Sequence, residues 1–268
     1  MSVLLITSCV KDEIYNTSHP DKGAVFIHVN LPQEMGNYTV EIDGHSTQGA
    51  EATLVYPFLL SPGEHNLLMY NHPDGLTIAD GIARVNATVL AKSNANTILP
   101  MPDCLYSAST ICKVMADDTI RVELVPLRRM RDLHFELIVT EGDPERIASV
   151  DGVLSGIAGT YTLATESLGR EPMTTVPVFT RDGSRIMADA RLFGTAGETQ
   201  VLVLTLYFID GRVQTIKNDL TEMLRAFNAD MQTTLEISGS LLIPTAANSG
   251  TVTINDWQVQ EVVNITIK

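Results

Sequence analysis

The sequence predicts a mostly β protein with two tandem antiparallel β-sandwich domains and one short helix in the second. Apolar residues alternate with polar ones in several segments, which is typical of strands that bury one face. Six Asp-Gly pairs, which favour tight turns, occur along the chain. At 268 residues, of which 44% are hydrophobic, the chain is long enough for two folded domains.

The first nine residues, MSVLLITSC, have the order of residues found at the end of a lipoprotein signal. Ile6 is followed by two small residues and then by Cys9, as signal peptidase II requires. We expect residues 1–8 to be a partial lipoprotein signal, although they are fewer than a secretory signal needs and contain no Lys or Arg. Cys9 would carry the lipid, and residues 9–22 would form a tether. A short buried strand with an incidental cysteine is the alternative.

We expect the N-terminal sandwich to span residues 23–125. The clearest strands there carry two apolar stripes, which are Val25, Ile27, Val29 and Leu31, and then Tyr38, Val40 and Ile42. The boundary is placed where Pro126 interrupts a strand.

Three arginines follow this boundary, at Arg128, Arg129 and Arg131. We expect them to form a solvated entrance to the next strand, and an anion site is the alternative.

We expect the C-terminal sandwich to span residues 126–268. Alternating stripes mark its first and last strands, which are Leu133, Phe135, Leu137 and Val139, and then Val263, Ile265 and Ile267. Residues 202–209 are almost wholly apolar, so we expect a central strand between two packed layers. Helical spacing of Leu220, Leu224 and Phe227 predicts a short helix over residues 219–227, capped by Asn218 or Asp219.

Catalytic and ligand-binding signatures are missing from the sequence. It contains no GxSxG elbow, HExxH motif or P-loop, and its six histidines have no close metal-ligand spacing. We therefore expect no enzyme, no cofactor and no metal site. The net charge of −14 repels phosphate backbones, so we expect no nucleic-acid partner. Cys104 and Cys112 fit either a local disulfide or two unpaired thiols.

Several segments resemble the Bacteroidales type V pilus family of anchor and tip lipoproteins, the FimB-like fimbrillin superfamily. They are residues 60–71 (LSPGEHNLLMYN), 129–137 (RMRDLHFEL), 147–158 (IASVDGVLSGIA), 191–194 (RLFG), 204–211 (LTLYFIDG), 219–221 (DLT) and 253–257 (TINDW). The resemblance implies transthyretin-like sandwiches and a role in building or anchoring fimbriae by strand donation between subunits. Lys11 and the two acids after it also resemble the surface-export signal of such lipoproteins, and a plain tether is the alternative.

These observations lead to one functional hypothesis. We expect a cell-surface lipoprotein of the outer membrane that acts as a structural subunit of fimbriae, an anchor or an accessory tip, with other fimbrial subunits as partners. The stripe Val263, Ile265 and Ile267 would be either a donated strand or the last strand of its own domain. The alternative is a surface lipoprotein that captures glycans on a host or bacterial surface through exposed aromatic residues. Trp257, the single tryptophan, fits a core position better than such a platform.

Overall fold

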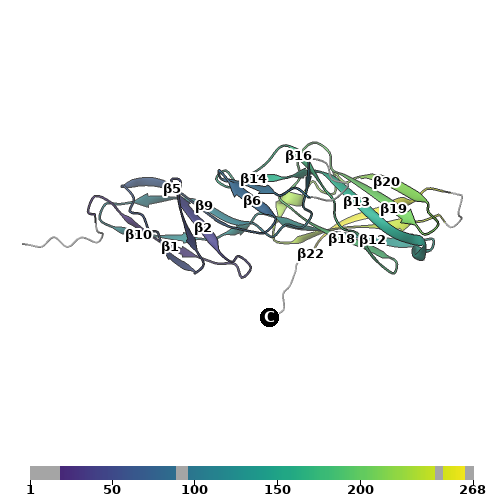
Figure 1. The fold of residues 1–268 in the computed structure, drawn as a ribbon, viewed down its shortest axis with the longest axis horizontal. Coiled ribbons are helices and arrows are strands. Elements are labelled where there is room, and N and C mark those ends of the chain that lie inside the picture. Colours follow the sequence, from purple (N-terminus) through teal and green to yellow (C-terminus); the bar gives the residue numbers. More distant parts are fainter. Residues whose placement is uncertain (1–18, 89–95, 245–249, 263–268) are drawn as a thin grey trace, which may run out of the picture.

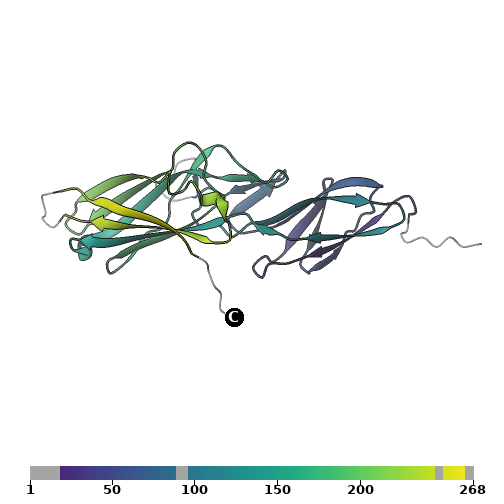
Figure 2. The same ribbon diagram turned by 180° about the vertical axis from the view of Figure 1, so that it is seen from behind.

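The structure, a computed structural model, describes residues 19–88, 96–244 and 250–262. The molecule is elongated, and its two groups of sheets follow one another along the long axis (Figure 1). Strands β1 (Ala24–Val29) and β10 (Thr119–Leu124) lie toward one end of the molecule (Figure 1). The last strand ends near the middle, where the two groups of sheets meet (Figures 1 and 2).

The first sheet pair consists of a three-stranded sheet, β10-β1-β4, and a five-stranded sheet, β11-β9-β5-β2-β3. Their strands are β1 Ala24–Val29, β2 Tyr38–Ile42, β3 His45–Gly49, β4 Thr53–Val55, β5 Gly63–Asn71, β9 Tyr106–Val114, β10 Thr119–Leu124 and β11 Leu127–Arg128.

The second sheet group consists of three sheets, β17-β18-β12-β21-β22, β20-β19-β13-β16-β8 and β15-β14-β7-β6. Their strands are β6 Leu76–Ala79, β7 Ile82–Val85, β8 Thr97–Ile98, β12 Arg131–Glu141, β13 Ile147–Ala158, β14 Thr160–Thr162, β15 Ser167–Leu168, β16 Pro172–Thr175, β17 Thr180–Asp182, β18 Arg185–Leu192, β19 Val201–Phe208, β20 Val213–Asp219, β21 Thr234–Leu242 and β22 Thr253–Val262. Two 3-10 turns, η1 Pro144–Arg146 and η2 Phe227–Ala229, complete the elements.

The mostly β prediction is confirmed, and the alternating stripes form the two cores. Val25, Ile27 and Val29 are buried in the first sheet pair, as are Tyr38, Val40 and Ile42. Leu133, Phe135, Leu137 and Val139 of β12 are buried in the second sheet group. The alternation of apolar and polar residues located these strands, because each of them buries only one face.

The sheets are not wholly antiparallel. Strand β1 pairs with β10 in parallel, β12 with β21, and β16 with β8. The expected antiparallel sandwiches therefore need correction at these three pairs. Alternation along one strand carries no information about the direction of its neighbour, because both pairings use the same period of two.

The short helix predicted over residues 219–227 is wrong. Strand β20 continues through Asp219, and the described residues contain no α-helix. One α-type bond, from the Leu224 N–H to the Leu220 carbonyl, is followed by a tighter bond from Phe227 to Leu224. Leu220, Leu224 and Phe227 are all fully buried. The apolar spacing therefore marked true core residues, but a sequence of turns is sufficient to bury them.

Two further expectations need correction. Strand β19 has one buried face, but Val201, Val203 and Tyr207 on its other face are only half-buried, so it does not lie between two layers. The pair Asp151-Gly152 lies inside β13 and not in a turn. A Cβ on Gly152 would lie 2.1 Å from the Phe179 ring, so close packing explains this glycine.

The segment from β6 to Leu105 extends into the second sheet group, although it precedes the expected boundary at residue 125. Strand β7 pairs with β14, and β8 pairs with β16. Ala83, Ile98 and Leu105 belong to the second core. The two groups are thus interleaved in sequence. We propose that the chain divides into residues 23–125 and 126–268. In this division, the segment from β6 to Leu105 belongs to the first part of the sequence but packs in the second sheet group.

A buried histidine of β5 joins the turn between β2 and β3 to the segment before β5. His65 Nδ1 lies 2.5 Å from Asp43 Oδ2, and His65 Nε2 lies 2.7 Å from the Ser61 carbonyl oxygen. Both partners are acceptors, so His65 satisfies both only when each ring nitrogen carries a proton. The bond to Asp43 is the main cause that raises the pKa of His65, and the same bond lowers the pKa of Asp43.

This geometry predicts a pH-dependent stability. A raised histidine pKa stabilises the fold fully below the unfolded pKa of about 6.5, and the effect is lost as the pH rises through the folded-state pKa. We expect the melting temperature of the wild type to fall across that window and His65→Gln to flatten the fall. Circular dichroism melts at a series of pH values measure this. His28→Gln, an exposed histidine of β1, is the control. Parallel curves for wild type and His65→Gln would contradict the prediction.

Candidate functional site

Strand β22 is the longest edge strand of the described sheets and the last described element of the chain. Among the residues that the structure describes, β22 pairs only with β21, so within this part of the chain its other side is a free edge. The strand has the sequence TINDWQVQEV, without the Pro, Lys or Arg residues that often protect sheet edges. A free edge offers unpaired backbone N–H and C=O groups to a further strand. We define β22 as the assembly edge.

The inward side chains of the assembly edge are only partly covered. Ile254 and Trp257 pack against the second core but remain half-buried, and Val259 is 42% exposed. Val259 lies opposite Ile237, which is fully buried. The strand therefore extends past the margin of the core and leaves apolar surface on its inner face.

A glycine in β21 allows this strand to lie close. A Cβ added to Gly239 would lie 2.9 Å from an Ile254 methyl group and 3.1 Å from the Trp257 ring. The register of the two strands shifts next to Gly239, and Asp256 there has a positive φ of 52°. This is a β-bulge, which turns the Trp257 ring onto the core. Trp257 is therefore a packing residue and not an exposed aromatic platform.

A buried arginine holds the far end of the assembly edge. Arg131 has no exposed surface. Its Nη2 donates to Glu261 Oε1 of β22 at 3.0 Å and to Thr233 Oγ1 at 2.8 Å. Its Nε donates to the Thr233 carbonyl and its Nη1 to the Phe227 carbonyl, both at 2.8 Å. The guanidinium lies 5.6 Å from the centre of the Phe227 ring.

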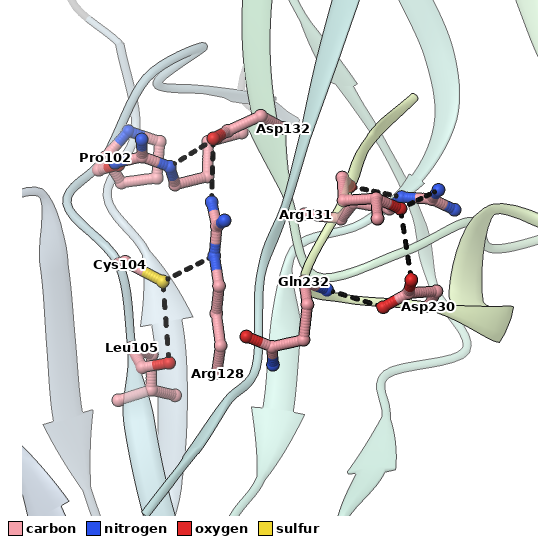
Figure 3. Close-up of polar contacts among 10 residues, drawn as sticks. Pro102, Cys104, Leu105, Arg128, Arg131, Asp132, Asp230 and Gln232 are labelled. Carbon is pink, nitrogen blue, oxygen red and sulfur yellow. Dashed lines mark hydrogen bonds and ion pairs between the residues drawn. The ribbon is translucent and has the colours of Figure 1, made fainter. Parts of the chain in front are cut away.

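These contacts join three parts of the chain. Arg131 begins β12, Phe227 and Thr233 belong to the loop before β21, and Glu261 lies near the end of β22. Asp230 extends the network, because its Oδ2 accepts from the Thr233 hydroxyl at 3.2 Å (Figure 3). A buried charge without a partner is strongly destabilising, so Arg131 favours the seated position of β22.

The expectation of a solvated arginine entrance is wrong. Arg131 is fully buried and Arg129 is buried too. Arg129 donates to Ser107 Oγ at 2.8 Å and forms an ion pair with Glu166. Because Ser107 belongs to β9 and Glu166 lies in the turn between β14 and β15, Arg129 connects the first sheet pair to the second sheet group.

Arg128 lies in a polar junction between the two groups, shown in Figure 3. Asp132 accepts from Arg128 Nη2 at 2.8 Å and from Arg191 Nε at 2.6 Å. Burial alone would raise the pKa of Asp132, but the bonds from the two arginines lower it. Arg128 Nε also donates to Cys104 Sγ at 3.2 Å. The arginines therefore contact carboxylates and backbone of this chain.

The two described cysteines are unpaired. Cys104 is half-buried at the junction, and Cys112 is buried in the first sheet pair. Burial raises the pKa of both thiols. Of the two alternatives, the structure therefore shows free thiols and no local disulfide.

The predicted site residues lie outside the described residues. They are Cys9, expected to carry the lipid, and Val263, Ile265 and Ile267, expected to form a terminal or donated strand. In sequence, Val263 directly follows β22 and has the same parity as Val259 and Glu261.

Sequence reasoning missed the pair formed by Arg131 and Glu261. A signal was present, because Arg131 has the same parity as Leu133, Phe135 and Leu137 and so lies on the buried face of β12. A charged residue in phase with a buried stripe needs a partner inside the protein. Its partner is 130 residues away in sequence, and nothing local identifies it.

The described ranges contain neither a metal-binding cluster nor a membrane-spanning helix. No group of three or more His, Cys, Asp or Glu residues there is arranged to hold a metal ion. No helix within those ranges is both long and apolar enough to cross a bilayer.

The fold defines a class of β-rich protein, built from several sheets and carrying one long edge strand. The particular family follows from its sequence. The chain belongs to the fimbrillin-A associated anchor proteins Mfa1 and Mfa2, whose family model matches residues 33–263. The type V pilus resemblance is thereby confirmed. Members of a fimbrial anchor family are structural proteins of the cell surface. None of the curated proteins compared with the chain matches it.

Solved structures share the fold. The fimbrial anchor protein Mfa2 from Porphyromonas gingivalis has a TM-score of 0.65 at 13% identity, over 90% of this chain and 99% of that chain. A candidate adhesin from Bacteroides ovatus has a TM-score of 0.61 at 15% identity, over 83% of this chain and 90% of that chain. A candidate polysaccharide-binding protein from Bacteroides thetaiotaomicron has a TM-score of 0.56 at 10% identity, over 91% of this chain and 98% of that chain. At these identities the likeness is one of fold.

The ion pair between the buried Arg131 and the half-exposed Glu261 predicts the stability of the assembly edge. We expect Glu261→Ala to lower the free energy of unfolding by about 1–2 kcal/mol, because Arg131 keeps its neutral acceptors but loses its carboxylate. Urea unfolding measures this, and hydrogen exchange should rise mainly in β22. Glu123→Ala, an exposed acid of β10, is the control. Unchanged exchange in β22 would show that the pair does not hold the strand.

Proposed function

We propose that this chain is a lipid-anchored surface protein of the outer membrane and a structural subunit of fimbriae, an anchor or an accessory tip. Family membership supports the fimbrial role. The observation that carries the assembly mechanism is the free edge of β22, ten residues long, with apolar surface on its inner face. Two tandem transthyretin-like domains, with residues 9–22 as the tether, are part of this proposal.

The assembly edge supports two ways of joining a partner subunit. A strand of the partner could pair with the free edge of β22, which would provide main-chain hydrogen bonds. Alternatively, residues 263–268 could enter the partner, with Val263, Ile265 and Ile267 in pockets of its core. Both modes need alternating apolar residues, because only one face of a strand can point into a core. We favour donation by Val263, Ile265 and Ile267 as the form to test first.

Replacing this stripe is expected to impair assembly. Val263→Ser, Ile265→Ser and Ile267→Ser together should shorten fimbriae and remove the higher bands of the subunit ladder, as should deletion of residues 263–268. Electron microscopy and unboiled gel electrophoresis of surface fractions measure both. The matched control is Asn264→Ser with Thr266→Ser, which changes the other face of the same segment. Normal fimbriae with the triple variant would remove strand donation from the proposal.

Lipid attachment is expected at Cys9. The Cys9→Ala variant of the full-length precursor should lose metabolic labelling by an alkyne-modified palmitate and leave the outer-membrane fraction. Cys112→Ala is the control, because this buried thiol is unavailable to the lipidation enzymes. Persistent labelling of Cys9→Ala would place the lipid elsewhere, and absence of label on the wild type would remove the anchor.

A further inference from the structure

Three hollows join into one groove across the outer face of the sheet β17-β18-β12-β21-β22. The first, about 450 Å³, lies between Met101, Val178 and the pair His134 and Asp189. The second, about 410 Å³, shares Met101, His134 and Asp189 with it and continues to Asp132 and Arg191. The third, about 370 Å³, shares Asp132 and Arg191 and ends at Tyr106 and Gln232 in the junction. Each volume is within the range of ligand sites in proteins.

The loop before β9 forms one side of this groove. The Arg191 backbone N–H donates to the Pro100 carbonyl at 2.7 Å, and Arg191 Nη1 donates to the Pro102 carbonyl at 3.1 Å. Met101, between these two anchors, is 46% exposed. Val178, which precedes the edge strand β17, is 68% exposed. Met101 and Val178 thus give the first hollow apolar walls, and the Arg191 contacts hold the backbone on both sides of Met101.

The floor is polar and rich in carboxylates, and Asp132 among them is paired with two arginines. Asp132 accepts from both Arg128 and Arg191, and Asp189 accepts from His134 Nδ1 at 2.7 Å. Glu236 accepts from Gln260 Nε2 at 2.5 Å. Asp189 and Glu236 have a histidine and a glutamine as partners, and their remaining lone pairs can accept from hydroxyl donors of a ligand. The net charge of the whole chain is −14, which disfavours the binding of an anionic ligand.

We propose that this groove binds a neutral polysaccharide chain. A sugar hydroxyl both donates and accepts hydrogen bonds, so it matches a floor on which carboxylate oxygens lie beside arginine and histidine N–H groups. Met101 and Val178 contact the C–H faces of the sugar rings. Tyr106 lines the junction end of the groove, where its hydroxyl can donate to a sugar oxygen. This ligand role goes beyond the proposed assembly role and uses different residues.

The test measures binding of neutral, anionic and cationic polymers to the full chain. Affinity electrophoresis against yeast mannan, amylose, a galactan, alginate and polylysine identifies the class, and calorimetry with the matching oligosaccharide gives the affinity. We expect retention by at least one neutral polymer. Asp189→Ala and Val178→Ala should each weaken it at least tenfold. Both side chains are mostly exposed, so these variants should fold.

Val213→Ala is the matched control, because this valine is 54% exposed on β20, in another sheet. Its binding should equal that of the wild type. The proposal is overturned if no neutral polymer is retained, if only alginate or only polylysine is retained, or if all three variants bind alike. Retention of polylysine alone would indicate a cationic peptide as the occupant. None of these results bears on fimbrial assembly, which is measured in cells with the substitutions at residues 263, 265 and 267.

Discussion

The burial of the Arg131 guanidinium imposes the strongest constraint on the second sheet group. A permanent charge in the interior must have every N–H group occupied, and the partners come from the loop at Phe227 and Thr233 and from Glu261 of β22. The end of the last described strand is therefore held by a charge at the start of β12. Loop, core and edge strand depend on one another through this side chain.

The same short run of sequence also joins the two groups of sheets. Arg129 contacts Ser107 of β9, and Arg128 shares Asp132 with Arg191 of β18. Neighbouring residues of an extended chain point in opposite directions, so Arg131 points into the core while Asp132 points into the junction. Two adjacent residues thus have different roles. Arg131 holds β22 against the second sheet group, and Asp132 takes part in the polar contacts between the two groups.

The sequence was sufficient for the strands but not for their partners. The alternation of apolar and polar residues identified β1, β2 and β12, because a strand that buries one face shows this pattern within a few residues. The turns at residues 220–229 resembled a helix, because Leu220, Leu224 and Phe227 have helical spacing and are buried by another backbone path. The arginines resembled a solvated cluster, because Glu166 and Glu261 are distant in sequence. Long-range topology also determines the parallel strand pairs, the pairing of β7 and β8 with strands of the second sheet group, and the groove. None of these features can be recognised from a short stretch of sequence.

The parallel pairing of β1 and β10 has a mechanical consequence. Six residue pairs, from Ala24 with Thr119 to Val29 with Leu124, join these strands side by side. A pull on the chain before β1, opposed by a pull on the chain after β10, draws the two strands past each other in shear. All bonds of the ladder then share the load and must rupture together, instead of opening one after another as in a zipper. A subunit that tethers a filament under flow would resist such tension at this first pair of strands.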